Sequence, residues 1–245
     1  MKFVAIADTH MAESEYPPGD VLLHAGDLTY EGMAVEVAGV ARWLKTQKER
    51  QGYKQVVVIA GNHDWLFQRE PEAARRIMKE NGLVYLQDSA VTLGADASVT
   101  EGLCPGPGRI TIYGSPWQPE FMNWAFNLKR GSELRAKWDM IPAGIDILMT
   151  HGPPHGILDG VGWPSEDVEP GDSSKAIRHL GCEELIKAIE RVKPKVHVFG
   201  HIHASRGRLV RDGTTFINAS IMNEIYDPTR KPIVFDYPVQ VDGHA

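Results

Sequence analysis

Cysteine is scarce in this sequence, and basic residues are fewer than acidic ones. Its 245 residues include two cysteines, Cys104 and Cys182, which form no disulfide framework and lie in no C-x-x-C metal-binding pattern. The 26 Lys and Arg are outnumbered by 32 Asp and Glu, and a net charge of −6 provides no broad positive field for nucleic acid. We interpret the basic stretch 206–211 as a solvated hairpin edge. We therefore expect a reducing, cytoplasmic environment and no nucleic-acid partner.

Long hydrophobic runs are absent too. The longest apolar runs are far too short to span a bilayer, and residues 1–10 lack the layout of a signal peptide. Apolar residues make up 42% of the chain and charged residues 24%, as is usual for a globular protein. Because no linker or shift in composition marks a boundary, we expect a single domain over 1–245 with no membrane association.

Short β-rich runs alternate with helical patterns along the chain. Near-continuous apolar character over four to eight residues predicts strands that are covered on both faces. Such runs occur at 2–8, 21–27, 54–62, 145–151 and 194–201, with further strands expected at 110–115, 214–220 and 232–237. Helical patterns occur at 33–50, 71–81 and 182–192. This alternation predicts an α/β architecture.

Polar side chains that can support chemistry follow five of these runs. They are Asp8 and His10, then Asp27, then Asn62 with His63 and Asp64, then His151, and finally His201 with His203. In open α/β sheets, ligands bind in the crevice beyond the carboxyl ends of the strands. If the chain stays extended after residue 199, His201 and His203 point to the same side and converge. Each piece alone is explained by a turn or a helix cap, but together they predict a metal site.

The donor atoms of this set indicate which metals fit. The potential ligands are Asp8, His10, Asp27, Asn62, His151, His201 and His203. Nitrogen and oxygen donors without thiolates suit manganese, iron, zinc, cobalt or nickel. The set is larger than one tetrahedral ion needs. Two divalent ions that share a carboxylate account for it most simply. Such a pair, about 3.5–4 Å apart, clamps a phosphoryl group. We expect manganese as the metal.

The motifs D-x-H, G-D, G-N-H-[D/E], H and G-H-x-H resemble those of the calcineurin-like metallophosphoesterase superfamily. They span residues 8 to 203, and all five are present without substitution. The stretches 85–89, 112–119, 126–131, 144–154 and 216–220 are also similar to the metallophosphoesterase-domain-containing group, which is allied to the class III cyclic nucleotide phosphodiesterases. The resemblance implies a four-layer α/β/β/α sandwich of two stacked mixed sheets flanked by helices.

The resemblance also implies roles for the site residues. One ion would be held by Asp8, His10, Asp27 and His203, and the other by Asp27, Asn62, His151 and His201, so that Asp27 bridges. A hydroxide that bridges the ions would attack phosphorus. We expect His63 to act as general acid for the leaving group. Asp64 is expected to fix the tautomer of His63, with capping of a following helix as the alternative.

The segment 117–130 suggests how a substrate is held. Its aromatic residues Trp117, Phe121, Trp124 and Phe126 can stack a nucleobase. Alternatively, the segment is a loop packed by its own aromatic side chains, or a contact in a homo-oligomer. Further candidates for substrate contact are His155, Asn127 and Arg130, because arginine suits bidentate phosphate binding.

The residues after Asp27 narrow the choice of substrate. They read L-T-Y-E-G and lack the arginine that serine/threonine phosphatases of this superfamily carry there. The sequence therefore favours a phosphodiesterase for small phosphoesters, with cyclic nucleotides as the expected substrates. A phosphomonoesterase is the nearest alternative. A non-catalytic interaction scaffold is the alternative from another class, and the complete ligand set argues against it.

Overall fold

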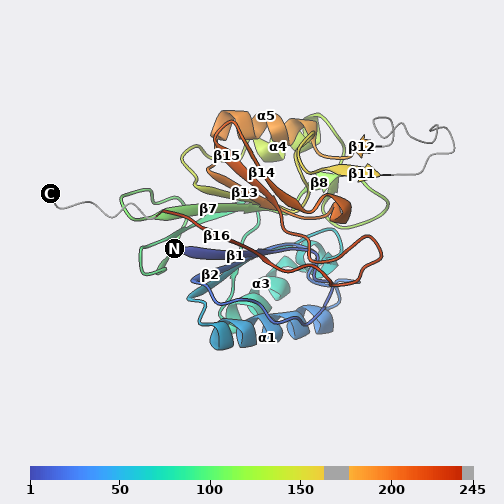
Figure 1. Ribbon diagram of the computed structural model, residues 1–245. Helices are drawn as coiled ribbons and strands as arrows, with labels where there is room; N and C mark the ends of the chain where they lie inside the picture. The colour runs from blue at the N-terminus through green and yellow to red at the C-terminus, as the bar shows by residue number, and fades with distance from the viewer. Residues whose placement is uncertain (163–176, 239–245) are drawn as a thin grey trace.

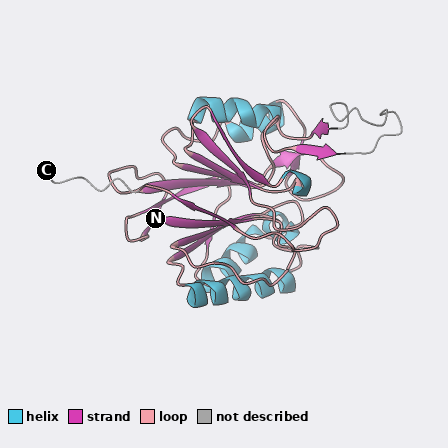
Figure 2. Cartoon of the chain, in the orientation of Figure 1, coloured by secondary structure: helices cyan, strands magenta, loops and turns pink. Residues whose placement is uncertain are grey.

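The computed structural model describes residues 1–162 and 177–238. Two β-sheets lie face to face, and helices cover the outer face of each (Figures 1 and 2). This arrangement confirms the four-layer α/β/β/α sandwich that the resemblance implies. Among the described residues, no helix combines the length and the apolar character needed to cross a membrane.

The first sheet holds the N-terminal part of the chain. Its five strands lie in the order β16-β1-β2-β3-β4, and all are parallel to their neighbours except β16, which is antiparallel to β1. The bounds are β1 (Lys2–Ile6), β2 (Val21–Ala25), β3 (Gln55–Ile59), β4 (Val84–Tyr85) and β16 (Ile233–Asp236). The sheet is covered on both faces, which explains why β1 to β3 read as continuous apolar runs.

Helices α1 (Ala34–Gln51) and α3 (Pro71–Glu80) cover the outer face of this sheet (Figure 1). The sequence marks their ends, because α1 stops at a left-handed Gly52 and α3 begins with proline in its first turn. The short helix α2 (Trp65–Arg69) precedes α3. All three contribute side chains to an apolar cluster beneath the sheet.

The second sheet has seven strands in the order β14-β15-β13-β10-β7-β5-β6. The bounds are β5 (Ser89–Leu93), β6 (Val99–Glu101), β7 (Ile110–Ser115), β10 (Ile147–Thr150), β13 (Val196–Phe199), β14 (Gly207–Arg211) and β15 (Thr214–Asn218). The four strands from β15 to β7 are parallel, while β14, β5 and β6 are antiparallel to their neighbours. Helices α4 (Ser132–Trp138) and α5 (Glu183–Val192) cover its outer face (Figure 1).

Small elements surround the carboxyl edge of the sandwich. They are the ribbon of β8 (Gln118–Pro119) and β9 (Asn127–Leu128), the ribbon of β11 (Gly160–Gly162) and β12 (Ile177–His179), and the 3-10 helix η1 (His203–Ser205). The inner faces of the two main sheets pack on each other, with Phe3, Leu23 and Ile59 on one side and Ile112 and Met149 on the other. Close packing of the sheets brings their carboxyl edges together.

The chain turns sharply where the functional residues follow the strands. Asp8, Asp27 and His201 have φ values of 54°, 54° and 66°, in the left-handed region that non-glycine residues seldom adopt. β13 ends at Phe199, so His201 and His203 are not on one extended strand, as the sequence had suggested. A turn and the start of η1 separate them instead and direct them to different parts of the site.

Candidate metal centre

The side chains that follow the strands converge at this shared edge. Within the described ranges 1–162 and 177–238, three groups of potential ligand atoms form there, and the atoms of each group lie within 4.8 Å of one another. The groups are Asp8 with His10 and His203, His10 with Asp27 and His63, and Asp27 with His151 and His201. His10 and Asp27 each belong to two groups, so the three form one continuous cluster.

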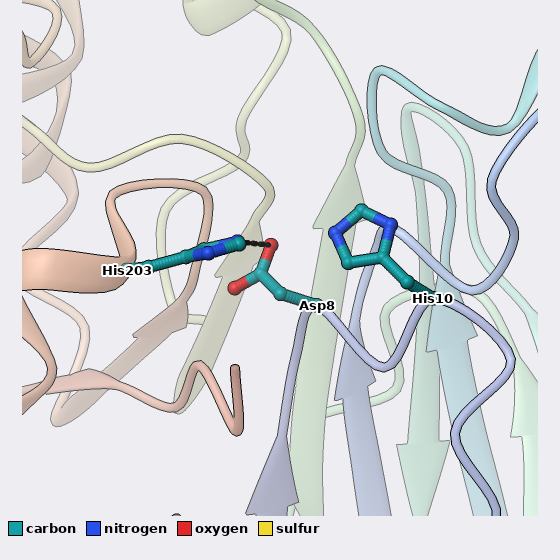
Figure 3. Close-up of side chains that lie close together, drawn as sticks. All are labelled: Asp8, His10 and His203. Atoms are coloured by element: carbon teal, nitrogen blue, oxygen red, sulfur yellow. Dashed lines mark ion pairs between the residues drawn. The ribbon is translucent and has the colours of Figure 1, made fainter. Parts of the chain in front are cut away.

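The first group joins the two sheets. The Asp8 carboxylate, which follows β1, lies between the imidazoles of His10 and His203 (Figure 3). Nε2 of His203 is 3.8 Å from Oδ1 of Asp8, and Nε2 of His10 is 3.8 Å from Oδ2 of Asp27. These pairs are too far apart to hydrogen-bond. Atoms that each lie about 2.0–2.2 Å from a shared ion have separations of this size.

The other end of the cluster centres on His151. Its Nε2 atom lies 2.9 Å from Oδ1 of Asn62 and 3.3 Å from Oδ2 of Asp27. The ring of His201 stands 5.0 Å from the His151 ring, measured between centroids. Asp27 therefore contacts members of both ends, at the position that the resemblance gives to a bridging carboxylate.

Glycines make room for this crowding. A Cβ atom on Gly61 would collide with the Asp27 carboxylate and with the His151 ring. A Cβ atom on Gly200 would collide with the Asp8 carboxylate. The glycines of the G-N-H and G-H-x-H motifs are thus explained by close approach of the side chains in the cluster.

Backbone carbonyl groups orient four of the imidazoles. The Nδ1–oxygen distances are 3.1 Å for His10 and Thr29, 2.7 Å for His63 and Tyr30, 3.0 Å for His151 and Ala25, and 3.0 Å for His203 and Asn223. A carbonyl oxygen only accepts, so each Nδ1 carries a proton and the lone pair of the neutral ring lies on Nε2. A metal-binding histidine with its other nitrogen hydrogen-bonded in this way has the tautomer it needs.

The charges in the cluster also suit a cation. Burial lowers the pKa of His151, but the Asp27 carboxylate outweighs burial and raises it to about 9, because it favours positive charge beside it; a cation bound there would displace the Nε2 proton. Burial would raise the pKa of Asp27, yet the neighbouring His151 holds it well below its usual range. Among the described residues, Nε2 of His10 is buried with no hydrogen-bond partner, which is rare for a polar atom. The residues present therefore fit bound divalent cations.

His63 lies beside the cluster with its ring between two others. The centroid of the His10 ring is 4.6 Å away, and that of Trp124 is 4.1 Å away. The ring lines the cavity described below. This placement lets its Nε2 atom meet a group bound there, as a general acid requires.

Asp64 does not orient His63. In the part of the chain that the structure describes, its carboxylate accepts hydrogen bonds from the backbone of Leu28, Thr29 and Gly61. Burial and the nearby Asp27 charge raise its pKa to about 6. The expected contact with the imidazole is replaced by the Tyr30 carbonyl, because the Asp64 side chain turns inward under the loop after β2. Asp64 also makes no side-chain cap for α2.

A cavity of about 720 Å³ opens beside the cluster. Its polar end is lined by Asp27, Asn62, His63, His201 and His203, and its apolar wall by Pro119, Phe121, Met122, Trp124, Pro153 and Ile202. The volume lies within the range of small-molecule sites and far exceeds that of a phosphate group. The cavity therefore has room for the organic part of a substrate.

The aromatic residues of the segment 117–130 divide between the cavity and the core. Phe121 is half exposed and lines the cavity together with Trp124. Phe126 is fully buried, and the Trp117 indole donates to the Asp88 carboxylate at 2.8 Å. Stacking on a substrate thus fits the first two rings, and internal packing of the segment fits the other two.

The other candidates for substrate contact have partners within the protein. Arg130 lines the cavity, but its guanidinium donates to the carbonyl groups of Leu180 and Gly181. The Asn127 amide donates to the carbonyl groups of Phe121 and Met122 and so shapes the cavity wall. His155 is exposed, with Nδ1 3.9 Å from the Asp159 carboxylate, and is not among the lining residues. Contact of these three with substrate stays a prediction.

Sequence reasoning missed the residues that hold the imidazoles. Tyr30 and Asn223 act through backbone carbonyl groups, which carry no residue-specific signal. Tyr226 packs on two of the histidines from a loop that the motifs do not include. No spacing rule connects these positions to the strand ends.

The sequence of this chain is similar to those of known proteins. The model of the calcineurin-like phosphoesterase family matches residues 1–205. The chain belongs to this family. Membership implies a metal-dependent phosphoesterase, and it confirms the resemblance inferred from the motifs.

Individual relatives support the same assignment. Human and mouse proteins named Metallophosphoesterase domain-containing protein 1 are 38% identical over 261 residues, covering 97% of this chain and 71% of each relative. A UPF0046 protein of Caenorhabditis elegans is 39% identical over 256 residues, covering 98% of this chain and 60% of the relative. A crystal structure of the Thermus thermophilus protein TT1561 has a similar fold, with a TM-score of 0.54 at 11% identity, over 96% of this chain and 98% of that one.

Proposed function

We propose that this member of the family is a dinuclear metal-dependent phosphodiesterase that hydrolyses small diesters, with cyclic nucleotides as natural substrates. The observation that carries the proposal is the cluster itself, in which the Nε2 lone pairs of oriented imidazoles and two buried carboxylates meet at the end of a cavity. When bound, divalent ions supply Lewis-acid stabilisation of phosphoryl oxygens and activate water. We expect two ions, and manganese as the metal.

The residues of the chain have separate tasks in this reaction. Asp8, His10 and His203 would hold one ion, Asn62, His151 and His201 the other, and Asp27 both. His63 keeps its Nδ1 proton on the Tyr30 carbonyl, 2.7 Å away. The protonated ring therefore donates from Nε2 to the leaving oxygen, and it returns to the neutral tautomer without moving.

The charge of the cavity supports a diester as substrate. A phosphomonoester carries up to two negative charges near neutral pH, because its second pKa is about 6. The cavity is lined by Arg130, whose guanidinium is already engaged, and by Arg178, but also by the acidic residues Glu120 and Glu224, so positive charge does not dominate it. A diester has a single negative charge and needs less neutralisation.

The apolar wall supports an aromatic or heterocyclic group on that diester. The Phe121 ring is half exposed, and its centroid stands 6.3 Å from that of His201. A base stacked on Phe121 would thus lie next to the cluster that holds its phosphate. The Phe121 ring and the metal cluster are therefore close enough for one small substrate to contact both.

A panel of phosphoesters tests the proposal. The manganese-reconstituted protein should hydrolyse bis(p-nitrophenyl) phosphate and 2′,3′- or 3′,5′-cyclic AMP faster than p-nitrophenyl phosphate. Asp27→Asn, measured in parallel, should abolish both metal binding and turnover. Faster hydrolysis of the monoester would establish a phosphomonoesterase instead. Full metal occupancy without turnover of any of these esters would establish an interaction scaffold.

A further inference from the structure

The loop 223–230, between β15 and β16, carries an aromatic side chain to the edge of the metal centre. The centroid of the Tyr226 ring lies 5.0 Å from that of His10 and 5.0 Å from that of His203. The Tyr30 ring also stacks on His10, with the centroids 5.3 Å apart and an interplanar angle of 25°. Two tyrosines therefore pack on the His10 imidazole.

Tyr226 holds this position against a conformational cost. Its φ of 62° lies in the left-handed region, which is sterically unfavourable for a residue with a side chain. Asn223 fixes the turn, because its side-chain oxygen accepts hydrogen bonds from the N–H groups of Ile225 and Asp227 at 3.0 and 2.9 Å. The Tyr226 N–H donates to the Asn223 carbonyl at 3.1 Å. The surrounding turn thus imposes a conformation that tyrosine alone would avoid.

The same turn orients one of the metal-binding candidates. The Asn223 carbonyl accepts the Nδ1 proton of His203 at 3.0 Å. The Arg230 guanidinium donates to the His203 carbonyl and, at 3.0 Å, to the Glu224 carboxylate. One loop therefore both fixes the His203 imidazole and brings the Tyr226 ring against it.

Tyr226 packs on buried ligand candidates while it is itself partly exposed. Asp8 and His10 are 0% and 1% exposed, whereas Tyr226 is 45% exposed. The cavity is lined by Tyr226 and His203 but by neither Asp8 nor His10. The Tyr226 ring thus packs on His10 and His203 where they approach the cavity.

We propose that Tyr226 is a cap over the metal position of Asp8, His10 and His203, and that it retards loss of an ion from that position. The inference rests on the proposed metal centre and adds a positioning residue that does not itself bind the ion. Release requires water or a chelator to reach the ion as the imidazole nitrogens dissociate from it. The ring blocks that approach and limits the rotation of both imidazoles.

The rate of metal release tests the cap directly. The full chain, loaded with Mn²⁺, is mixed with excess EDTA and desalted at intervals, and bound manganese is measured by mass spectrometry. Tyr226→Ala should speed the slowest phase of release by about tenfold or more, which corresponds to about 1.4 kcal/mol. Tyr226→Phe keeps the ring and should release manganese at the wild-type rate. Ile225→Ala changes an exposed neighbour on the same loop and should also leave the rate unchanged.

Two results would overturn the cap. One is release from Tyr226→Ala at the wild-type rate, and the other is equally fast release from Tyr226→Phe. If Tyr226→Ala fails to fold, Tyr226→Gly, which adopts the positive φ without strain and also removes the ring, replaces it in the same comparison. A wild-type protein that retains no manganese at all would refute the metal centre together with the cap. A release rate that does not depend on the residue at position 226 would refute the cap alone.

Discussion

The Nδ1 atom of His63 lies 2.7 Å from the carbonyl oxygen of Tyr30, 33 residues earlier in the chain. This hydrogen bond fixes the orientation of the ring, which lines the cavity, through Nδ1 rather than Nε2. His63→Ala should therefore lower kcat by roughly 10²–10⁴, the usual contribution of a general acid. Bound metal should stay at the wild-type level, because His63 is not one of the proposed ligands. Steady-state kinetics and metal analysis of one preparation check both statements, and an unchanged kcat would exclude the role.

The apolar wall predicts a selective effect on substrate binding. Phe121→Ala should raise KM for diesters that carry an aromatic ring by about tenfold, because stacking on such a side chain contributes about 1–3 kcal/mol. KM for dimethyl phosphate, which has no ring, should not change. Val210→Ala, on an exposed strand away from the cavity, is the matched control. An equal rise in KM for both esters would mean that Phe121 shapes the loop rather than the substrate site.

Two glycines should respond to the same substitution in opposite ways. Gly39 lies within α1, and a Cβ atom there would meet only the Met11 side chain, at 3.9 Å. Gly39→Ala should raise the free energy of unfolding by about 0.5–1 kcal/mol. Gly61→Ala would instead push Cβ into the Asp27 carboxylate, so it should lower stability and weaken metal binding. Urea unfolding and metal titration of both variants check the pair, and equal effects would contradict the collision.

The buried His197 predicts a loss of stability in acid. Its ring is fully buried, Nε2 lies 2.8 Å from the Thr150 hydroxyl, and burial lowers its pKa to about 3. The unfolded chain binds a proton here below about pH 6.5, and the folded chain does so only near pH 3. His197 therefore contributes stability above pH 6.5 that is lost as the pH falls toward 3, by up to about 1.4 kcal/mol per pH unit.

His197→Gln removes this titration. Its unfolding free energy should fall less steeply than that of the wild type between pH 6.5 and 3. Comparison of the two proteins at pH 8 gives the loss that does not depend on pH, which comes from the changed hydrogen bond to Thr150. Parallel curves over the acidic range would mean that His197 is protonated in the folded protein as well.

The sequence predicted the strands more reliably than the turns that follow them. The strand at 110–115 has the bounds of β7, and the helical patterns at 33–50 and 71–81 differ from α1 and α3 by one residue at their ends. Burial on both faces accounts for this success, because a short, continuous apolar run between turn residues is typical of a strand inside a layered fold. The expected extended arrangement of His201 and His203 was wrong, because the His201 backbone is left-handed.

The residues that form the cluster could also be predicted from the sequence, but the contacts that hold them in place could not. Asp, Asn and His at successive strand ends indicate a site because parallel strands end at one edge of a sheet. The Asp64 carboxylate bonds to backbone N–H groups instead of His63 because the fold buries it, and no local pattern reports burial of that kind. Roles for Asn127 and Arg130 in substrate contact remain predictions, since both side chains pair with neighbouring backbone.

The Asp8 carboxylate comes from the first sheet and accepts the backbone N–H of His201, from the second, at 3.0 Å. The two residues are 193 positions apart, and the Ala7–Ser220 bridge joins the same halves. A cation bound between these halves would act as a clasp, because it stabilises only the state in which both are docked. Saturation at about 100 times the Kd would add about 2.7 kcal/mol, so metal supply would set resistance to unfolding and proteolysis as well as turnover.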